Sequence, residues 1–163
     1  MNHTKIKGEV SGAFLVGIIN TFYKLNVLSE SGLNLPEIDP TQWYPYSLFI
    51  DTIESIEKSQ PSEDLMFQAG IYFIQAWYNY GPGKTMIRST LDWIHANDSS
   101  AGVVRGGTRN EIGYCDMKFF DEKKGIAIYE NVTPLYGKVV QGVFYGGCRI
   151  FDDIEYVNVS IYA

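Results

Sequence analysis

One segment constrains the fold more than any other, because it is an apolar stretch enclosed by two strong helix-boundary signals. Residues 61–64 (Pro-Ser-Glu-Asp) offer a capping serine and acidic side chains for a first helical turn, and residues 81–83 (Gly-Pro-Gly) end the stretch. The apolar side chains between them fall on most sides of a helix: Leu65, Phe67, Ala69, Ile71, Phe73, Ile74, Trp77 and Tyr78. A helix of this kind must be surrounded by other elements. The sequence therefore predicts a central helix.

Three further helices are predicted in the first half of the chain, at about residues 5–97. Residues 10–26 carry apolar side chains mostly at spacings of three and four, with Ser11 as the N-cap. A second helix is expected to open at residues 43–46 (Trp-Tyr-Pro-Tyr), because proline is tolerated in a first turn. Another is expected from about residue 84 to residue 96. The first half is therefore interpreted as a layer of four helices.

The second half, at about residues 109–163, reads mostly as strands. Residues 111–120 and 125–129 flank a polar turn, which predicts a hairpin. We interpret residues 134–149 as a helix because the segment is longer than a usual strand, although its glycines weaken that interpretation. The tail at residues 156–162 alternates polar and apolar side chains, which predicts a last strand with one buried face.

This order of elements indicates an α+β fold. We expect the four helices to pack on a small antiparallel sheet of three to four strands, with one helix before the last strand. No repeat or linker divides the chain, and a length of 163 residues suits a single domain that spans residues 1–163.

Composition excludes several classes of protein. The formal net charge of -6 argues against nucleic-acid binding by a basic surface. Aromatic residues make up 15% of the chain, which argues against disorder. We expect no membrane insertion, because no apolar run approaches the 20 or so residues of a membrane helix. No export signal follows Met1, so we expect a cytoplasmic protein in which Cys115 and Cys148 are free thiols.

No catalytic or metal-binding motif emerges. Residues 81–85 (Gly-Pro-Gly-Lys-Thr) are interpreted as a turn, because a phosphate-binding loop would need glycine where Tyr78 stands. The chain has two histidines, which are too few for an ordinary multi-histidine zinc site. We therefore expect a protein that is not an enzyme and holds no metal.

The aromatic side chains of the helical half are the richer signal. Most aromatics at helical spacing belong to a core, but tyrosine and tryptophan also line ligand pockets and protein interfaces. The first hypothesis is a pocket between the helices and the sheet for a small apolar or flat molecule. Its expected lining is Tyr44, Tyr72, Trp77, Trp93 and His95. The alternative is a protein-interaction module that forms a homodimer through its aromatic helical surface.

Short motifs over residues 6–161 resemble a superfamily of ligand-binding domains: Lys7-Gly8, Ile38-Asp39-Pro40 with Trp43-Tyr44-Pro45, Ala69-Gly70, Tyr80-Gly81-Pro82 and Gly142-Val143-Phe144. This superfamily includes H-NOX heme sensors, vinyl-reductase-like domains and TRAPP vesicle-tethering subunits. The chain looks most like a bacterial paralogous group of unknown function seen in myxobacteria. The resemblance implies a sensor or ligand-binding domain, or a TRAPP-like homodimer.

The resemblance also implies a position for heme. His95 would be the iron ligand, and Tyr129 would begin the Tyr-x-Ser-x-Arg motif that holds the heme propionates. Here Asn131 and Thr133 replace the serine and the arginine of that motif. Loss of the arginine removes the bidentate partner of a propionate. We therefore expect no cofactor, with heme held by His95 and Tyr129 as the remaining alternative.

Overall fold

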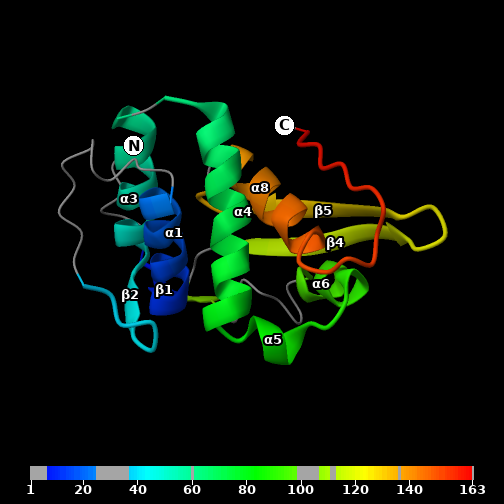
Figure 1. Cartoon of the computed structure of the whole chain (residues 1–163), viewed down its shortest axis with the longest axis horizontal. Helices are drawn as coiled ribbons and strands as arrows, with labels where there is room; N and C mark the ends of the chain where they lie inside the picture. The colour runs from blue at the N-terminus through cyan, green and yellow to red at the C-terminus, as the bar shows by residue number, and fades with distance from the viewer. Residues whose placement is uncertain are drawn as a thin grey trace.

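The computed structural model describes residues 7–24, 37–59, 61–98, 107–110, 113–135 and 137–162. Over these residues the chain forms an α+β fold with six helices and two small antiparallel sheets (Figure 1). The helices are α1 (Gly12–Lys24), α3 (Tyr46–Ser59), α4 (Glu63–Tyr80), α5 (Gly83–Met86), α6 (Thr90–Ala96) and α8 (Gly137–Cys148). The strands are β1 (Glu9–Ser11), β2 (Trp43–Pro45), β3 (Thr108–Arg109), β4 (Tyr114–Asp121) and β5 (Ile126–Val132).

Helix α4 is the central helix that the sequence predicts. Its first turn is capped by Ser62, whose Oγ accepts a hydrogen bond from the Leu65 amide at 3.3 Å. At its other end the Gly81 amide donates to the Trp77 carbonyl oxygen at 2.9 Å. Both boundaries therefore fall where the capping signals place them.

Helix α4 lies between α1 and α3 on one side and α8 on the other (Figure 1). The approach of α4 to α8 depends on glycine. A Cβ added to Gly70 would lie 2.1 Å from the Val139 carbonyl oxygen and 2.9 Å from the Cα of Gly142. Since these distances are far below normal contact, only glycine lets the two backbones come so close.

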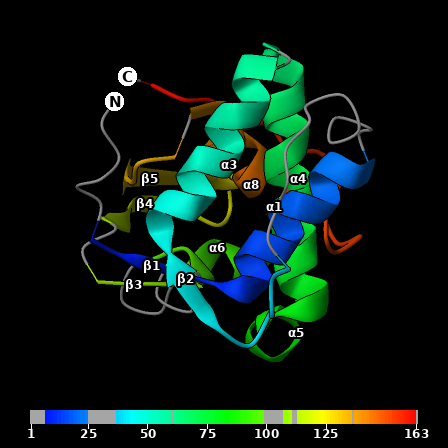
Figure 2. The same ribbon diagram turned by 90° about the vertical axis from the view of Figure 1, so that its left-hand side faces the viewer.

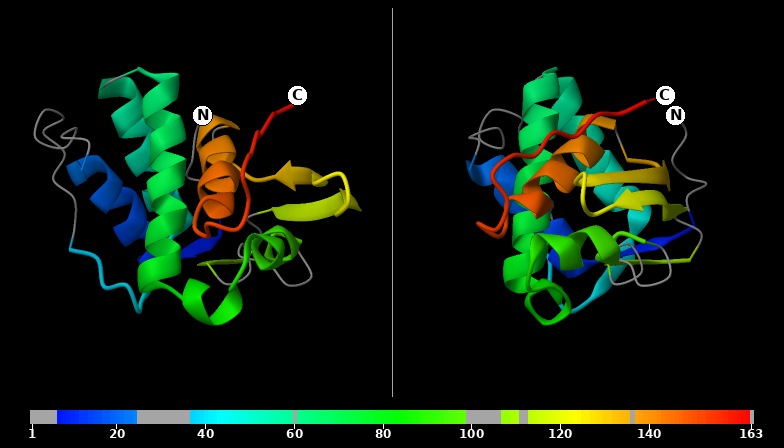
Figure 3. Two further views of the ribbon diagram at one scale, coloured as in Figure 1. Left: turned by 45° about the vertical axis from the view of Figure 1, so that its right-hand side comes forward. Right: turned by 90° about the vertical axis from the view of Figure 1, so that its right-hand side faces the viewer.

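The two sheets are separate. The first has the order β2-β1-β3, with Val10 in the middle strand opposite both Tyr44 and Thr108. Figure 2 shows these three strands beside the ends of α1 and α3. The second sheet is the predicted hairpin, in which β4 and β5 pair with a bulge between Met117 and Phe119. Figure 3 shows this hairpin extending away from the helices.

The structure corrects the sheet and one helix boundary. The sequence predicts one sheet built from the second half, whereas the three-stranded sheet takes two of its strands from the first half. Trp43 does not open a helix: residues 43–45 form β2, and the helix begins at Tyr46. Because β2 lies at the edge of its sheet, Pro45 is accommodated there as an edge residue. The first helix begins at Gly12, directly after β1 and after the predicted cap Ser11, whose Oγ accepts a hydrogen bond from the Phe14 amide at 3.4 Å.

The helix predicted for residues 84–96 is two helices. The Ser89 hydroxyl accepts from the Asp92 amide at 3.0 Å, and the Asp92 carboxylate accepts from the Arg88 amide at 2.8 Å. This reciprocal capping starts α6 anew at Thr90. The helical spacing of the apolar residues continues from α5 into α6, so the sequence pattern does not reveal that the helix is interrupted between them.

Residues 134–149 contain the predicted helix, α8, but the prediction of a last strand is wrong. Residues 156–162 are extended and belong to no sheet. This segment runs along α8, where Gln141 Nε2 donates to the Val159 carbonyl oxygen at 2.6 Å. The alternation of polar and apolar residues in this segment therefore arises because every second side chain faces α8.

None of the helices in the described part of the chain has the length and apolarity that a bilayer crossing requires.

Candidate functional site

An apolar pocket lies where the helical layer meets the β4–β5 hairpin and α8. The centre of a water-sized sphere can move through about 60 Å³ of it. The pocket is partly open to solvent. Its wall takes residues from α1, α3, α4 and α8 and from strands β3, β4 and β5. Its described lining residues are Phe14, Tyr46, Phe49, Phe73, Asn97, Thr108, Cys115, Asn131, Thr133, Leu135, Val140, Val143 and Phe144.

The helical side of the pocket is a connected group of aromatic rings. Phe14 and Phe73 meet edge to face with their ring centroids 4.5 Å apart. Phe73 contacts Phe49 at 5.4 Å, and Phe49 contacts Tyr46 at 5.5 Å. Such tilted and T-shaped contacts are favourable for aromatic pairs. Because α1, α3 and α4 each hold part of this group, the wall is fixed by the packing of three helices.

The Tyr46 hydroxyl is a polar group inside this wall. The residue is 1% exposed, and burial raises the pKa of its hydroxyl. The hydroxyl donates no hydrogen bond to any residue in the described ranges, and Tyr46 is one of the residues that line the pocket. Buried tyrosine hydroxyls usually find a partner. A molecule in the pocket could supply the missing acceptor.

The opposite side of the pocket adds amide, hydroxyl and thiol groups. The buried Asn97 donates through Nδ2 to the Trp93 carbonyl oxygen at 2.7 Å. Asn131 Nδ2 donates to the Thr133 hydroxyl at 3.3 Å. Burial, with smaller contributions from nearby carboxylates, raises the pKa of the Cys115 thiol to about 12. The thiol is therefore protonated at neutral pH and is a poor nucleophile.

The five residues that the sequence proposes for a pocket lie elsewhere, and none is among the described residues that line this one. Trp77 and Trp93 are fully buried in the core with their ring centroids 6.3 Å apart, and within the described ranges the Trp77 indole N–H has no hydrogen-bond partner. The Tyr44 hydroxyl accepts from the Asp39 amide at 2.9 Å. Tyr72 is half-buried, with Lys24 Nζ 5.2 Å from its ring centroid.

The fifth residue, His95, is exposed in the last turn of α6, and its ring contacts Phe120 with centroids 5.0 Å apart. Tyr129 donates its hydroxyl to the Ile94 carbonyl oxygen at 2.6 Å. Neither residue lines the pocket, so an iron ligand at His95 would not point into it. These positions do not fit a heme, and we derive no heme site from them. Within the described ranges no group of three or more potential metal ligands occurs.

The lining residues themselves are hard to find from sequence. Phe14, Phe49 and Phe73 repeat at helical spacing like any core residue. Asn131 and Thr133, at the positions compared with the propionate motif, do line the pocket. The one available signal is a tyrosine, Tyr46, on an otherwise apolar helix face, because a buried hydroxyl needs a partner.

No protein-family model matches this chain, and neither the curated proteins nor the solved structures contain a match. The resemblance to the superfamily of H-NOX, vinyl-reductase-like and TRAPP domains therefore rests on short sequence motifs and stays a prediction.

Proposed function

We propose that this domain binds a small, neutral, largely apolar molecule that carries one hydrogen-bond acceptor. The observation that carries the proposal is Tyr46, a residue of the pocket wall that is 1% exposed and whose hydroxyl donates to no described residue. An acceptor on the bound molecule would satisfy this donor.

The charge of the pocket restricts the ligand further. Every described residue that lines it is uncharged at neutral pH, including the protonated Cys115. A charged ligand would lose its hydration without gaining a counter-charge, which is costly in an apolar site. A neutral molecule avoids that cost. The same absence of ionised lining residues favours binding over acid–base or nucleophilic catalysis.

The test uses two probes of nearly the same shape, cyclohexanone and methylenecyclohexane. Both are neutral rings, but only the ketone can accept a hydrogen bond from Tyr46. Affinities are measured by titration with two-dimensional NMR. The ketone should bind about fivefold more tightly, which corresponds to about 1 kcal/mol for one hydrogen bond.

Two variants locate the effect. Tyr46→Phe should remove the preference for the ketone, whereas Tyr72→Phe, a half-buried tyrosine of α4 outside the pocket, should keep it. Leu135→Trp places a large ring at the pocket wall from the segment after β5 and should weaken both probes. The proposal is wrong if neither probe binds the folded wild type, or if Tyr46→Phe retains the preference.

A further inference from the structure

The outer face of the β4–β5 hairpin exposes large apolar side chains. We use this name for the face on which residues 126, 128, 130 and 132 of β5 lie with their cross-strand partners. Five apolar residues on it are between 39% and 53% exposed: Tyr114, Phe119, Ile126, Ile128 and Val132. Tyr114 lies opposite Val132 and Phe119 opposite Ile128, so four of them form two cross-strand pairs.

The other face of the hairpin is already covered. Tyr129 contacts Phe144 of α8 with ring centroids 4.9 Å apart, and Phe120 contacts His95 of α6 at 5.0 Å. An antiparallel sheet that packs on a core with one face normally has a polar second face. Here the second face carries exposed apolar side chains from both strands, and such an exposed patch is typical of an interaction surface.

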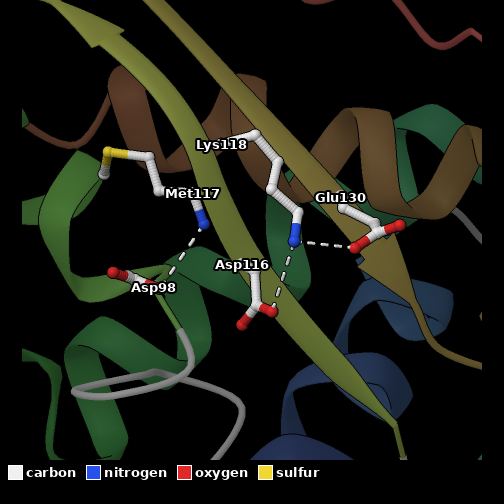
Figure 4. Close-up of polar contacts among 5 residues, drawn as sticks. All are labelled: Asp98, Asp116, Met117, Lys118 and Glu130. Atoms are coloured by element: carbon white, nitrogen blue, oxygen red, sulfur yellow. Dashed lines mark hydrogen bonds and ion pairs between the residues drawn. The ribbon is translucent and has the colours of Figure 1, made fainter.

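Charged residues separate the two apolar pairs. Lys118 is the extra residue at the bulge, and its Nζ lies 2.9 Å from Glu130 Oε2 and 3.6 Å from Asp116 Oδ2. Figure 4 shows the three side chains together, with the lysine between the two carboxylates. Asp98, also drawn there, accepts a hydrogen bond from the Met117 amide on the edge of β4. Along the hairpin the outer face therefore carries an apolar pair, then the charged group, then a second apolar pair, with Asp121 opposite Ile126 next to the turn.

This pattern is self-complementary. A two-fold axis through the charged group would place the Tyr114–Val132 pair of one copy against the Phe119–Ile128 pair of the other. The same axis would bring each Lys118 toward Glu130 and Asp116 of the second copy. An isologous interface needs a surface of this kind, in which opposite charges and apolar ends exchange places. We propose that the outer face of the hairpin is a homodimer interface.

The first test is the oligomeric state as a function of concentration, measured by sedimentation velocity. The wild type should dimerise, and Phe119→Glu or Ile128→Glu should weaken the dimer at least about tenfold, because a charge would be buried against an apolar pair. Leu91→Glu is the matched control, since Leu91 is 38% exposed on α6 and lies off the hairpin. It should dimerise like the wild type.

The second test addresses the charges. Lys118→Glu and Glu130→Lys should each weaken self-association. An equal mixture of the two variants, one of them labelled with 15N to separate the masses, should form heterodimers, which native mass spectrometry resolves. Circular dichroism verifies that each variant is folded. A wild type that stays monomeric at all concentrations would overturn the proposal. So would a dimer that the Phe119 and Ile128 variants leave intact, or a mixture that forms no heterodimer.

Discussion

The Tyr129 hydroxyl on β5 donates a 2.6 Å hydrogen bond to the carbonyl oxygen of Ile94 in α6. The two residues are 35 positions apart in sequence, and the bond joins the hairpin to the helical layer. Asn131, two residues further along β5, lines the pocket. This contact therefore helps to set the distance between the two sides of the pocket.

Replacing Tyr129 by phenylalanine should lower the free energy of unfolding by about 1 kcal/mol. One partly buried hydrogen bond is lost, and the Ile94 carbonyl oxygen loses the donor that Tyr129 supplies. Urea unfolding followed by circular dichroism measures the change. Tyr145→Phe is the control, since the Tyr145 hydroxyl donates to no described residue and that ring stays in contact with Phe67. Equal stability losses in the two variants would show that the Tyr129–Ile94 bond contributes nothing specific.

The start of α6 is tied to the segment after α8 by Asp153. Its carboxylate accepts hydrogen bonds from the Thr90 amide, at 2.8 Å, and from the Thr90 hydroxyl. Burial raises the pKa of Asp153, but the hydrogen bonds from Thr90 outweigh that effect, so the pKa lies below its ordinary value. A lowered pKa means that the contribution to stability is present above about pH 4 and is lost as the pH falls through the pKa of the folded state.

Asp153→Asn should therefore cost about 0.5–1 kcal/mol at pH 7, the range for an exposed carboxylate at a helix N-terminus, and less at low pH. Unfolding in urea at several pH values from neutral to acidic checks this. Asp152→Asn is the neighbouring control, because Asp152 is exposed and makes no such contact with Thr90. If the stability loss caused by Asp153→Asn were the same at low pH as at neutral pH, the lowered pKa of Asp153 would be contradicted.

The two buried thiols should make the fold sensitive to alkali. Burial raises the pKa of Cys115 to about 12 and that of Cys148 to about 11, from an ordinary value of 9.0. As the pH rises, the thiols ionise in the unfolded chain before they ionise in the folded protein. Their contribution to the free energy of unfolding is therefore fully present below about pH 9 and is lost as the pH rises toward 11 to 12. Each contributes a slope of up to about 1.4 kcal/mol per pH unit in that window. Cys115→Val should reduce the slope of stability against pH above 9, and an unchanged slope would contradict the raised pKa.

Gly147 should be intolerant of any side chain. A Cβ there would lie 2.0 Å from Cε2 of the fully buried Trp93. Gly147→Ala should therefore destabilise the protein by about 1–3 kcal/mol or more through overpacking. Gly137→Ala, in the same helix, meets only Ile161 Cδ1 at 3.5 Å and should be neutral or slightly stabilising. Thermal unfolding distinguishes the two, and similar melting temperatures would count against the tight packing.

Sequence reasoning recovers the elements whose ends are marked by local chemistry. Ser62 and Gly81 bound α4 as expected, and the polar turn between β4 and β5 locates the hairpin. Sequence reasoning fails where contacts between distant segments determine the secondary structure. Residues 43–45 become a strand because β1 pairs with them, and the alternating tail lies along a helix instead of joining a sheet.

The pocket follows the same rule. Its aromatic wall uses side chains that a sequence pattern cannot separate from the core, since Phe49 and Phe73 point inward at the same spacing as their neighbours. The two tryptophans that stand out in the sequence fill the core. What distinguishes a pocket is the space left between helices and hairpin, and that depends on how distant segments pack.

The most direct test of the central claim is to locate a bound probe. Intermolecular nuclear Overhauser effects between cyclohexanone and the isotope-labelled protein report which side chains lie within a few ångströms of the ring. We predict effects to the methyl groups of Leu135, Val140 and Val143 at the pocket wall. Effects confined to Ile128 and Val132 on the outer face of the hairpin, or to no methyl group of the pocket, would contradict the account.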